Sequence, residues 1–314
     1  MRSLAEIYPA DRVTLREVGL RDGLQLVRTF PSTSAKRDWI AGEYAAGVRH
    51  FEIGSFLPAS RMPQFADIRE MIKTVARLEG AFSMGLALNE RGAIDALETE
   101  VDEIVCVVSA TEEHSQANMR RSRDAAVKLV GKVVELRNQS QGKPLVNAGI
   151  AMAFGCSIAG TVDPAEVLHL AEACLEAGAD IIGIADTVGF AGPRQVGGLC
   201  VEMKRLCGDR PFLVHLHDTR GMAIANASAA LDAGARILDG SLGGLGGCPF
   251  APGATGNIVF EDLVYLCETM GFRTGIDMDA LTAVRAIPES EMPGEQLYGA
   301  IARAKPPNTM DWRA

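Results

Sequence analysis

The feature that most constrains the fold of this chain is the regular alternation of short apolar runs with amphipathic stretches. Eight runs are short and mostly apolar, as strands buried on both faces should be, and they cover residues 13–19, 48–54, 81–87, 103–109, 146–153, 180–186, 212–217 and 236–242. Eight helical patterns follow them, at residues 34–46, 63–77, 90–98, 117–138, 164–177, 193–207, 219–233 and 257–270. Eight strand–helix pairs predict an α/β fold, a parallel (β/α)8 or TIM barrel.

The loop after the first strand separates this fold from the alternative, a doubly wound open sheet. An open sheet of that kind usually carries a glycine-rich dinucleotide-binding loop at this place. Here residues 21–25 read Arg-Asp-Gly-Leu-Gln, which cannot serve that role. We therefore expect a single catalytic domain over residues 1–314, with a barrel at about 13–271 and a short C-terminal helical extension at about 272–314.

Composition and charge argue against several classes of protein. The chain has 314 residues, of which 47% are hydrophobic, and a formal net charge of −9 with dispersed lysines and arginines, which argues against nucleic-acid binding. It contains no run of about 18 uninterrupted apolar residues, so no membrane span is expected. Seven cysteines without a Cys-x-x-Cys pair, and an N-terminus without a signal pattern, predict reduced thiols and a cytoplasmic location.

The loop after the first strand carries the first residues that could do chemistry. Arg21 could stabilise a developing oxyanion, and Asp22 could hold a metal ion or move a proton. Loops at strand ends are where α/β proteins carry their chemistry. The alternative is an ordinary surface Arg–Asp pair in a turn.

Two histidines form the second candidate group. In a strand, residues i and i+2 point to the same face, so His215 and His217 are both expected to face the barrel interior at the end of the seventh strand. Two neutral imidazoles on one face are good ligands for a divalent metal ion. The alternative is one packed core histidine beside one exposed histidine.

A glycine-rich stretch at residues 243–257 follows the eighth strand. Its many glycines predict a flexible loop that could close over a substrate as a lid. Cys248 lies in this loop, either as a general acid or simply as a free thiol. Asn257, where the next helix is expected to begin, is either a helix N-cap or a neutral oxygen ligand.

Two further carboxylates lie near the ends of strands. Glu52 lies inside an apolar strand and needs a partner, and Arg21 on the neighbouring first strand is the obvious one. Asp186, at the end of the sixth strand, is a similar case, with an N-cap or a hydrogen bond to the following turn as the alternative. In a closed barrel, strand eight lies beside strand one. The histidines, the glycine-rich stretch, Arg21 and Glu52 therefore meet at one end of a single wall.

With these residues in place, the sequence resembles the 3-hydroxy-3-methylglutaryl-CoA lyases, within a wider group of TIM-barrel metallolyases that includes the isopropylmalate synthases. The resemblance covers about residues 13–304. Its most specific segments are Glu-Val-Gly-Leu-Arg-Asp-Gly-Leu-Gln at 17–25, His-Leu-His-Asp-Thr at 215–219, Gly-Leu-Gly-Gly-Cys-Pro at 244–249 and Gly-Ala-Thr-Gly-Asn at 253–257.

The resemblance implies a divalent cation, Mg²⁺ or Mn²⁺, held by Asp22, His215, His217 and Asn257. It also implies that Arg21 stabilises the enolate oxygen of the thioester product, that Glu52 orients Arg21, and that Cys248 lies near the reacting carbon. The implied reaction is a metal-assisted retro-Claisen cleavage of an acyl-CoA to acetyl-CoA and a keto acid. The base is His215 or Asp22, and the acid that reprotonates the enolate is Cys248 or water.

The chain departs from the family pattern where substrate and CoA approach. Residues 54–56 read Gly-Ser-Phe where the family usually has Thr-Ser-Phe, residues 61–62 read Arg-Met where a Lys-Trp pair is expected, and Pro252 replaces a lysine. The substrate is therefore open between 3-hydroxy-3-methylglutaryl-CoA, another 3-hydroxy-3-alkylglutaryl-CoA and another β-hydroxy acyl-CoA. A condensing acyltransferase of the isopropylmalate synthase type, and a barrel that binds a ligand without catalysis, are competing hypotheses. We expect an acyl-CoA substrate and a homo-oligomer, either a dimer or a tetramer.

Overall fold

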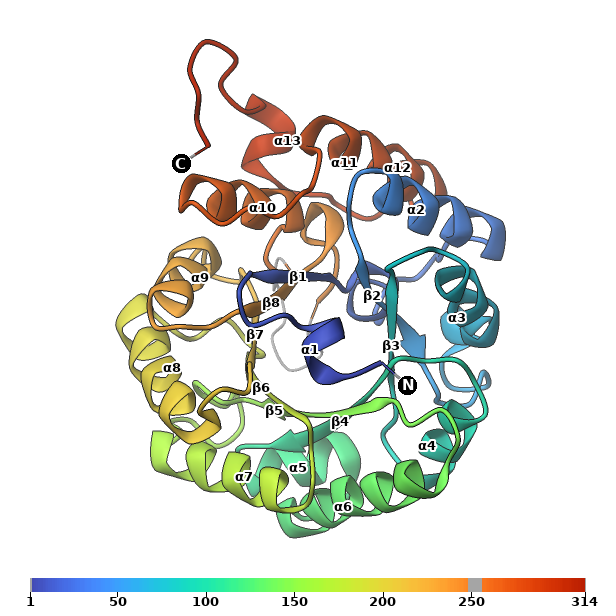
Figure 1. Cartoon of the computed structure of the whole chain (residues 1–314), viewed down its shortest axis with the longest axis vertical. Helices are drawn as coiled ribbons and strands as arrows, with labels where there is room; N and C mark the ends of the chain where they lie inside the picture. Colours follow the sequence, from blue (N-terminus) through green and yellow to red (C-terminus); the bar gives the residue numbers. More distant parts are fainter. Residues whose placement is uncertain (1, 248–255, 314) are drawn as a thin grey trace.

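Eight parallel strands close into a barrel in sequence order, with β8 paired to β1. The computed structural model describes residues 2–247 and 256–313. The strands are β1 (Thr14–Glu17), β2 (His50–Ser55), β3 (Phe82–Leu86), β4 (Glu103–Ser109), β5 (Leu145–Ala151), β6 (Ile181–Asp186), β7 (Leu213–Leu216) and β8 (Ile237–Gly240). Figure 1 looks down the barrel, with the strands as an inner ring and the helices around them. The predicted TIM barrel is confirmed.

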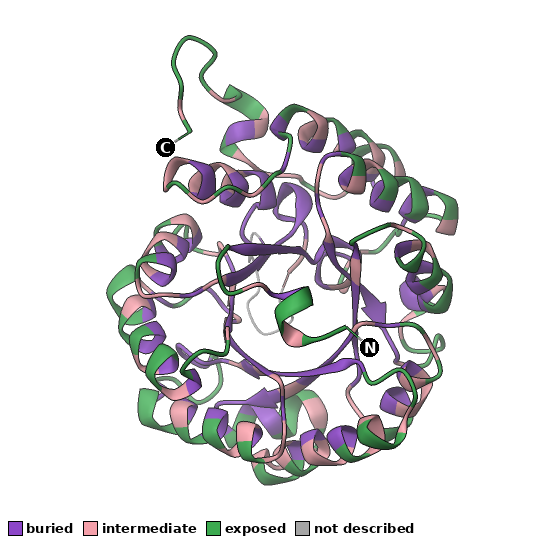
Figure 2. Cartoon of the chain, viewed as in Figure 1, coloured by how far each residue is buried: buried purple, intermediate pink, exposed green. Residues whose placement is uncertain are grey.

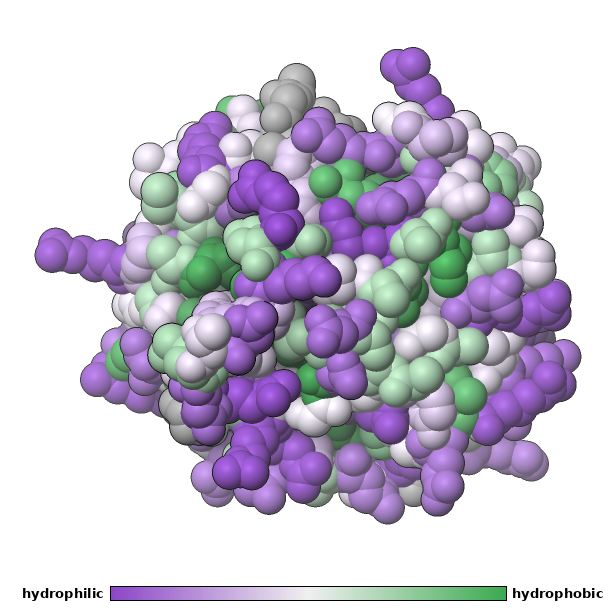
Figure 3. All heavy atoms as spheres, turned by 90° about the horizontal axis from the view of Figure 1, so that it is seen from above, coloured by the Kyte–Doolittle hydropathy of each residue, from purple (hydrophilic) through white to green (hydrophobic). Residues whose placement is uncertain are grey.

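A helix follows each strand and packs on the outside of the barrel. These helices are α2 (Thr33–Ala45), α3 (Ile68–Ala76), α4 (Glu90–Leu97), α6 (Arg123–Gln139), α7 (Pro164–Glu176), α8 (Pro193–Cys207), α9 (Ala223–Asp232) and α10 (Phe260–Thr269). Their inner faces and the strands are buried, and their outer faces are exposed (Figure 2). Hydrophilic and hydrophobic residues are interspersed on the outer face seen in Figure 3. Among the described residues, no helix is long and apolar enough to cross a membrane.

Four of the expected helices begin or divide elsewhere in the structure. Helix α3 begins at Ile68 rather than at residue 63, and α9 begins at Ala223 rather than at residue 219. The predicted helix at 117–138 is wrong, because α5 (Glu112–Met119) ends where Arg120 adopts φ 54°, and α6 begins a new helix. The Ser122 side chain caps α6 by accepting the Ala125 N–H at 3.2 Å. The helix expected from Asn257 begins instead at Phe260, because residues 257–259 pair with the ends of β7 and β8.

A short helix closes the amino-terminal end of the barrel. Helix α1 (Leu4–Ile7) lies across the centre of the ring in Figure 1. Ile7 and Tyr8 pack against the lowest inward-facing residues of the strands, which are Leu145, Ile181, Leu213 and Ile237. The barrel interior is therefore filled at this end, and a ligand has to enter from the carboxyl ends of the strands.

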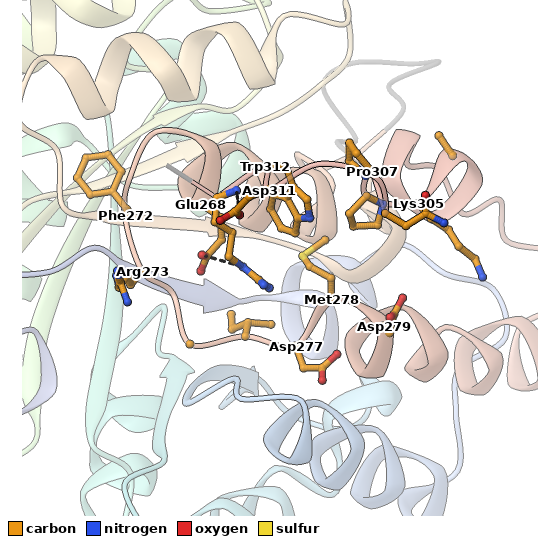
Figure 4. Close-up of a pocket in the computed structure, with 16 residues that line it drawn as sticks. Glu268, Phe272, Arg273, Asp277, Met278, Asp279, Lys305, Pro307, Asp311 and Trp312 are labelled. Atoms are coloured by element: carbon orange, nitrogen blue, oxygen red, sulfur yellow. Dashed lines mark hydrogen bonds and ion pairs between the residues drawn. The ribbon is translucent and has the colours of Figure 1, made fainter.

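The C-terminal segment packs outside the barrel. Helices α11 (Met278–Val284) and α12 (Ala286–Glu291) contact α2, and α13 (Ala300–Ala304) contacts α10. The tail returns along α10, where the ring of Trp312 lies 4.8 Å from that of Tyr265. Between the tail and the start of α11 lies a cavity of about 1420 Å³, with an Arg313–Glu268 ion pair of 3.4 Å at its edge (Figure 4).

Candidate active site

A tight turn between β1 and α2 presents the first two site residues. Residues 19–23 form one π-helical turn, in which the N–H groups of Arg21, Asp22 and Gly23 converge on the carbonyl oxygen of Val18 at 2.8–3.2 Å. Gly19 is required here, because a Cβ would lie 2.5 Å from Oε1 of the buried Glu17. The turn fixes the backbone of Arg21 and Asp22, as π-turns at functional sites often do.

Arg21 is held by the strand-two glutamate, as the sequence predicted. Its Nε donates to Glu52 Oε1 at 2.7 Å and its Nη2 to Glu52 Oε2 at 2.9 Å, a bidentate pair. Nη1 donates to Asp22 Oδ1 at 2.6 Å and to Gln25 Oε1 at 3.3 Å. The side chain of Glu52 is only 2% exposed, and Arg21 is the cation that pairs with this buried carboxylate. The alternative of a surface Arg–Asp pair is excluded.

Asp22, His215 and His217 form a cluster that could hold a metal ion. Their ligand atoms all lie within 4.8 Å of one another. Asp22 Oδ2 lies 3.5 Å from His217 Nε2 and 3.9 Å from His215 Nε2. Burial alone would raise the pKa of Asp22, but the Arg21 guanidinium and the two imidazoles outweigh it and hold this pKa well below its usual range. Asp22 is therefore a carboxylate ready to bind a cation.

Asn257 completes the cluster from the far side. Its Nδ2 donates to Asp22 Oδ2 at 2.9 Å and to the Leu245 carbonyl at 3.1 Å. Its Oδ1 is buried and lacks a hydrogen-bond partner among the described residues. Buried polar atoms without partners are unusual and call for a ligand. The donor set therefore fits a divalent ion, and the N-cap interpretation of Asn257 is wrong.

His215 is oriented by a residue that the sequence interpretation missed. Its Nδ1 lies 2.7 Å from Oδ1 of Asp239, a buried carboxylate on β8. Burial disfavours the imidazolium, yet Asp239 and Asp22 raise the pKa of His215 from 6.5 to about 9. Nε2 has one lone pair, so at any instant it binds a metal ion or takes a proton, but not both. The criterion that singled out Glu52, a carboxylate inside an apolar strand, would have found Asp239 as well.

In the part of the loop after β8 that the structure describes, the glycines allow the backbone to pack closely against neighbouring residues. Residues 242–244 form a buried 3₁₀ turn, and Ser241 Oγ donates to the Leu245 carbonyl. Gly246 has φ 130°, and a Cβ there would lie 2.6 Å from Nδ2 of Asn257. This part of the stretch positions Asn257. Cys248 and the rest of the expected lid lie outside the described residues.

Asp186 lies beside the site, and its side chain accepts hydrogen bonds from the backbone of the following turn. Its Oδ1 accepts the Phe190 N–H at 2.8 Å, and its Oδ2 accepts the Ala191 N–H at 3.1 Å. Burial raises the pKa of this carboxyl, although the two hydrogen bonds oppose the shift. The residue is absent from the described lining of the barrel cavity. The structure thus matches the alternative interpretation, and a catalytic role for Asp186 stays a prediction.

The cluster opens onto a cavity of about 390 Å³ at the carboxyl ends of the strands. Arg21, Asp22 and the two histidines line its polar side, whereas Leu86, Val105 and Val107 of β3 and β4 line its other side. None of its described lining residues lines the C-terminal cavity of Figure 4.

The floor of the cavity is a buried polar layer. Arg16 Nη1 donates to Glu103 Oε1 at 2.9 Å, and that carboxylate also accepts from Tyr8 Oη at 2.6 Å and from Asn147 Nδ2 at 2.8 Å. All four side chains are buried, and Arg16 reaches the cavity lining. Sequence reasoning missed this layer, although charged residues within apolar strands were its signal.

Comparison with known proteins agrees with this geometry. The HMGL-like family model matches residues 12–287 of the chain. The chain belongs to the HMGL-like family. Hydroxymethylglutaryl-CoA lyase from Bacillus subtilis is 35% identical over 286 residues, which are 91% of this chain and 94% of that protein. (R)-citramalyl-CoA lyase from Chloroflexus aurantiacus is 36% identical over 284 residues, 87% of this chain and 89% of that protein.

A solved structure of an HMG-CoA lyase is similar to nearly the whole of this HMGL-like chain. An HMG-CoA lyase from Acinetobacter baumannii, in complex with coenzyme A and 3-methylmalate, has a TM-score of 0.88 and 36% identity and covers 99% of both chains. The named relatives are carbon–carbon lyases, and this HMGL-like protein is an enzyme of that class. The resemblance drawn from the sequence is confirmed.

Proposed function

We propose that this protein cleaves a 3-hydroxy-3-methylglutaryl-CoA-type substrate by a metal-assisted retro-Claisen reaction. The products are acetyl-CoA and a β-keto acid, which is acetoacetate when the substituent at C3 is methyl. The observation that carries the proposal is the place of Arg21. It is fixed by Glu52 and lies 2.6 Å from Asp22, at the mouth of a cavity that the metal-binding cluster also lines.

The residues that would hold the ion are Asp22, His217 and Asn257 through Oδ1, with Nε2 of His215 as a further ligand. A bound Mg²⁺ or Mn²⁺ would act as a Lewis acid toward the substrate oxygens and lower the pKa of the hydroxyl. Oxygen and imidazole donors suit these ions better than a softer metal. The chain's own part is to align the hydroxyl and carboxylate of the substrate toward this cluster.

His215 is the better of the two candidate bases. The pKa of Asp22 lies well below its usual range, so this carboxylate takes a proton reluctantly. Without a bound ion, the pKa of His215 is raised to about 9, because Asp239 stabilises the imidazolium. A divalent cation in the cluster would oppose this protonation and keep the ring neutral, with Asp239 ready to stabilise the charge once Nε2 accepts a proton. We therefore assign the hydroxyl proton to Nε2 of His215. Asp22, His217 and Asn257 would hold the ion while Nε2 of His215, no longer a ligand, carries that proton.

Arg21 stabilises the charge that develops as the C–C bond breaks. The bond to Glu52 uses one of the two Nη2 hydrogens, and the second is available for the thioester oxygen on the cavity side. A cation aimed at an oxygen that gains charge stabilises the transition state more than the ground state. Reprotonation of the enolate falls to Cys248 or water, and the role of Cys248 stays a prediction.

Release of acetyl-CoA from 3-hydroxy-3-methylglutaryl-CoA, measured with and without EDTA and with added Mg²⁺ or Mn²⁺, tests the proposal. Cleavage that needs the ion is the expected result. Condensation of acetyl-CoA with a keto acid, without cleavage, would instead establish the synthase alternative.

A matched pair of histidine variants tests the metal ligands. His217→Ala should weaken Mg²⁺ and Mn²⁺ binding in a calorimetric titration while the protein remains folded. His169→Ala, at an exposed histidine of α7, is the control and should bind the ion normally. Equal affinity of the two variants would refute the ligand assignment.

We further propose a cytoplasmic location and a homo-oligomer, a dimer or a tetramer. The six cysteines that the structure describes are all free and buried, which suits a reducing compartment. Light scattering coupled to size-exclusion chromatography tests the oligomeric state.

A further inference from the structure

We propose that the substrate of this enzyme carries an apolar substituent at C3 that is larger than methyl, and that a hollow over Gly149 and Gly183 receives it. The inference rests on the proposed function, because it concerns the substrate of the same site. It starts from a pair of glycines inside the barrel.

Two glycines on neighbouring strands leave the lower part of the cavity open. Gly149 of β5 pairs directly with Gly183 of β6, and both line the cavity. One inward-facing step further along, Ala185 pairs with His215. The hollow therefore lies just below the level of His215, where other strands of the barrel carry full side chains.

The backbone does not demand a glycine at position 149. Its φ lies outside the left-handed region, and a Cβ built there would meet only the Cys106 carbonyl oxygen, at the ordinary distance of 3.6 Å. A glycine inside a strand weakens the strand and often marks a place that a ligand approaches closely. The missing side chain thus leaves space on the cavity side of the strand. Gly183 is more tightly surrounded, with Leu213 Cδ2 at 3.3 Å.

The wall beside this hollow is apolar. Val107 pairs directly with Gly149, and Val105 pairs with Leu86 on the next strand. Val105, Leu86 and Met84 form a small cluster of buried hydrophobic residues, with Leu88 and Val107 packed against it. Four members of this cluster line the cavity, all except Met84. Such a surface stabilises an apolar group and leaves a polar group without hydrogen bonds.

Only one part of the substrate is left to occupy this space. In the proposed function, the hydroxyl and carboxylate face Asp22 and His217, and the thioester oxygen faces Arg21. The CoA arm leaves through the carboxyl end of the barrel, because α1 closes the other end. The remaining group on C3 points toward the hollow. A methyl group would leave the space above Gly149 unfilled, whereas an alkyl chain of about four carbons or more would cover it and contact Val107 and Leu86.

Side-chain size at position 149 provides the test. Wild type, Gly149→Ala and Gly149→Val are assayed for acetyl-CoA release from 3-hydroxyglutaryl-CoA thioesters with methyl, butyl or hexyl at C3. We expect the wild type to show a higher kcat/KM for butyl than for methyl. The ratio of these two values should fall in Gly149→Ala and fall by at least about tenfold in Gly149→Val, since single methylene groups in apolar pockets change kcat/KM by about 10–200-fold.

Controls separate pocket size from general damage. Gly198→Val changes an exposed glycine of α8 with nothing within 4 Å of its Cβ, and should leave the butyl-to-methyl ratio unchanged. Thermal melting shows whether each variant is folded. If Gly149→Val does not fold, the butyl-to-methyl ratio of Gly149→Ala alone tests the inference. A wild type that prefers methyl, or a ratio that stays constant in the Gly149 variants, overturns the inference and leaves the proposed function intact. Cleavage of none of the three thioesters overturns both.

Discussion

Nδ1 of His215 lies 2.7 Å from Oδ1 of Asp239, while Nε2 of the same ring faces Asp22 at 3.9 Å. The carboxylate thus fixes which nitrogen of His215 points toward the metal-binding cluster. Carboxylate partners of this kind hold the ring orientation of a metal-ligating histidine and raise its basicity. Asp239 is only 3% exposed, and it therefore acts on His215 without competition from solvent.

Asp239→Asn should weaken metal binding by about 10–100-fold, the effect typical when the partner of a metal-ligating histidine is lost. The amide keeps the shape of the side chain and removes its charge, so the barrel should remain folded. Calorimetric titration with Mg²⁺ and Mn²⁺ measures the affinity, with Asp232→Asn on the exposed side of α9 as the control.

The pH profile of kcat in Asp239→Asn gives a second readout. The loss of the carboxylate should also lower the pKa of His215 and shift the basic catalytic group to lower pH. If both the metal affinity and the profile stayed unchanged, Asp239 would have no positioning role.

The buried His50 should make the protein less stable as the pH falls. Burial lowers the pKa of His50 to about 4, and its Nε2 lies 2.7 Å from the Ile7 carbonyl oxygen. The unfolded chain takes up a proton at about pH 6.5, but the folded chain does so only near 4. The stabilising effect of the neutral ring is therefore complete above pH 6.5 and is lost as the pH falls from 6.5 to 4.

His50→Gln removes this titration and keeps an N–H donor near Ile7. The free energy of unfolding of wild type minus that of the variant should fall by about 3 kcal/mol between pH 7 and pH 4, at about 1.4 kcal/mol per pH unit. Urea denaturation at a series of pH values measures both proteins. A difference that does not vary with pH would show that His50 is not held neutral by the fold.

A thiol reagent should inactivate the enzyme through Cys248, and substrate should protect it. Burial raises the pKa of Cys106, Cys174, Cys200 and Cys267 to about 12 and that of Cys207 to about 11. These thiols should react slowly, because the thiolate is the nucleophile. Peptide mapping by mass spectrometry after partial alkylation should find the label on Cys248. Full turnover in Cys248→Ser would leave no acid role for the thiol.

The sequence predicted the barrel because its signal is local and repeated. Each strand must bury both faces, so each appears as an apolar run regardless of its partners. The spacing of His215 and His217 sufficed to place both rings on one face, and closure of the barrel brought them to Arg21. The site residues that were missed or misinterpreted have a different origin, because their positions depend on the register between strands and on the conformation of the loops.

Asp239 and Asn257 illustrate the difference. The pairing of Leu213 with Ile237 sets His215 opposite Asp239, and no local pattern in the sequence states that register. Asn257 looked like a helix start because a helix does follow it. It instead bridges to His217, and Ile258 N donates to the Leu216 carbonyl oxygen at 2.9 Å. The turn that results points the amide toward Asp22.

Arg21 provides the test that separates transition-state stabilisation from substrate binding. The thioester enolate carries a negative charge that the substrate lacks, so a guanidinium aimed at that oxygen acts mainly on the barrier. We expect Arg21→Met to lower kcat by about 10³-fold, the loss typical for one oxyanion donor, with little change in KM. Arg21→Lys should rescue poorly, because an ammonium cannot bind Glu52 through two parallel bonds and reach the substrate as well.

Arg21 pairs with the buried Glu52, so a loss of folding must be distinguished from a loss of catalysis in the Arg21 variants. Arg21→Met leaves the carboxylate of Glu52 buried without a cation, which is strongly destabilising. Thermal melting must therefore accompany the kinetics, and Arg21→Lys, which keeps the positive charge, is the variant to use if Arg21→Met unfolds. A folded variant whose KM rises while kcat stays near that of wild type would show that Arg21 only grips the substrate. A loss confined to kcat would establish that its charge acts on the enolate oxygen.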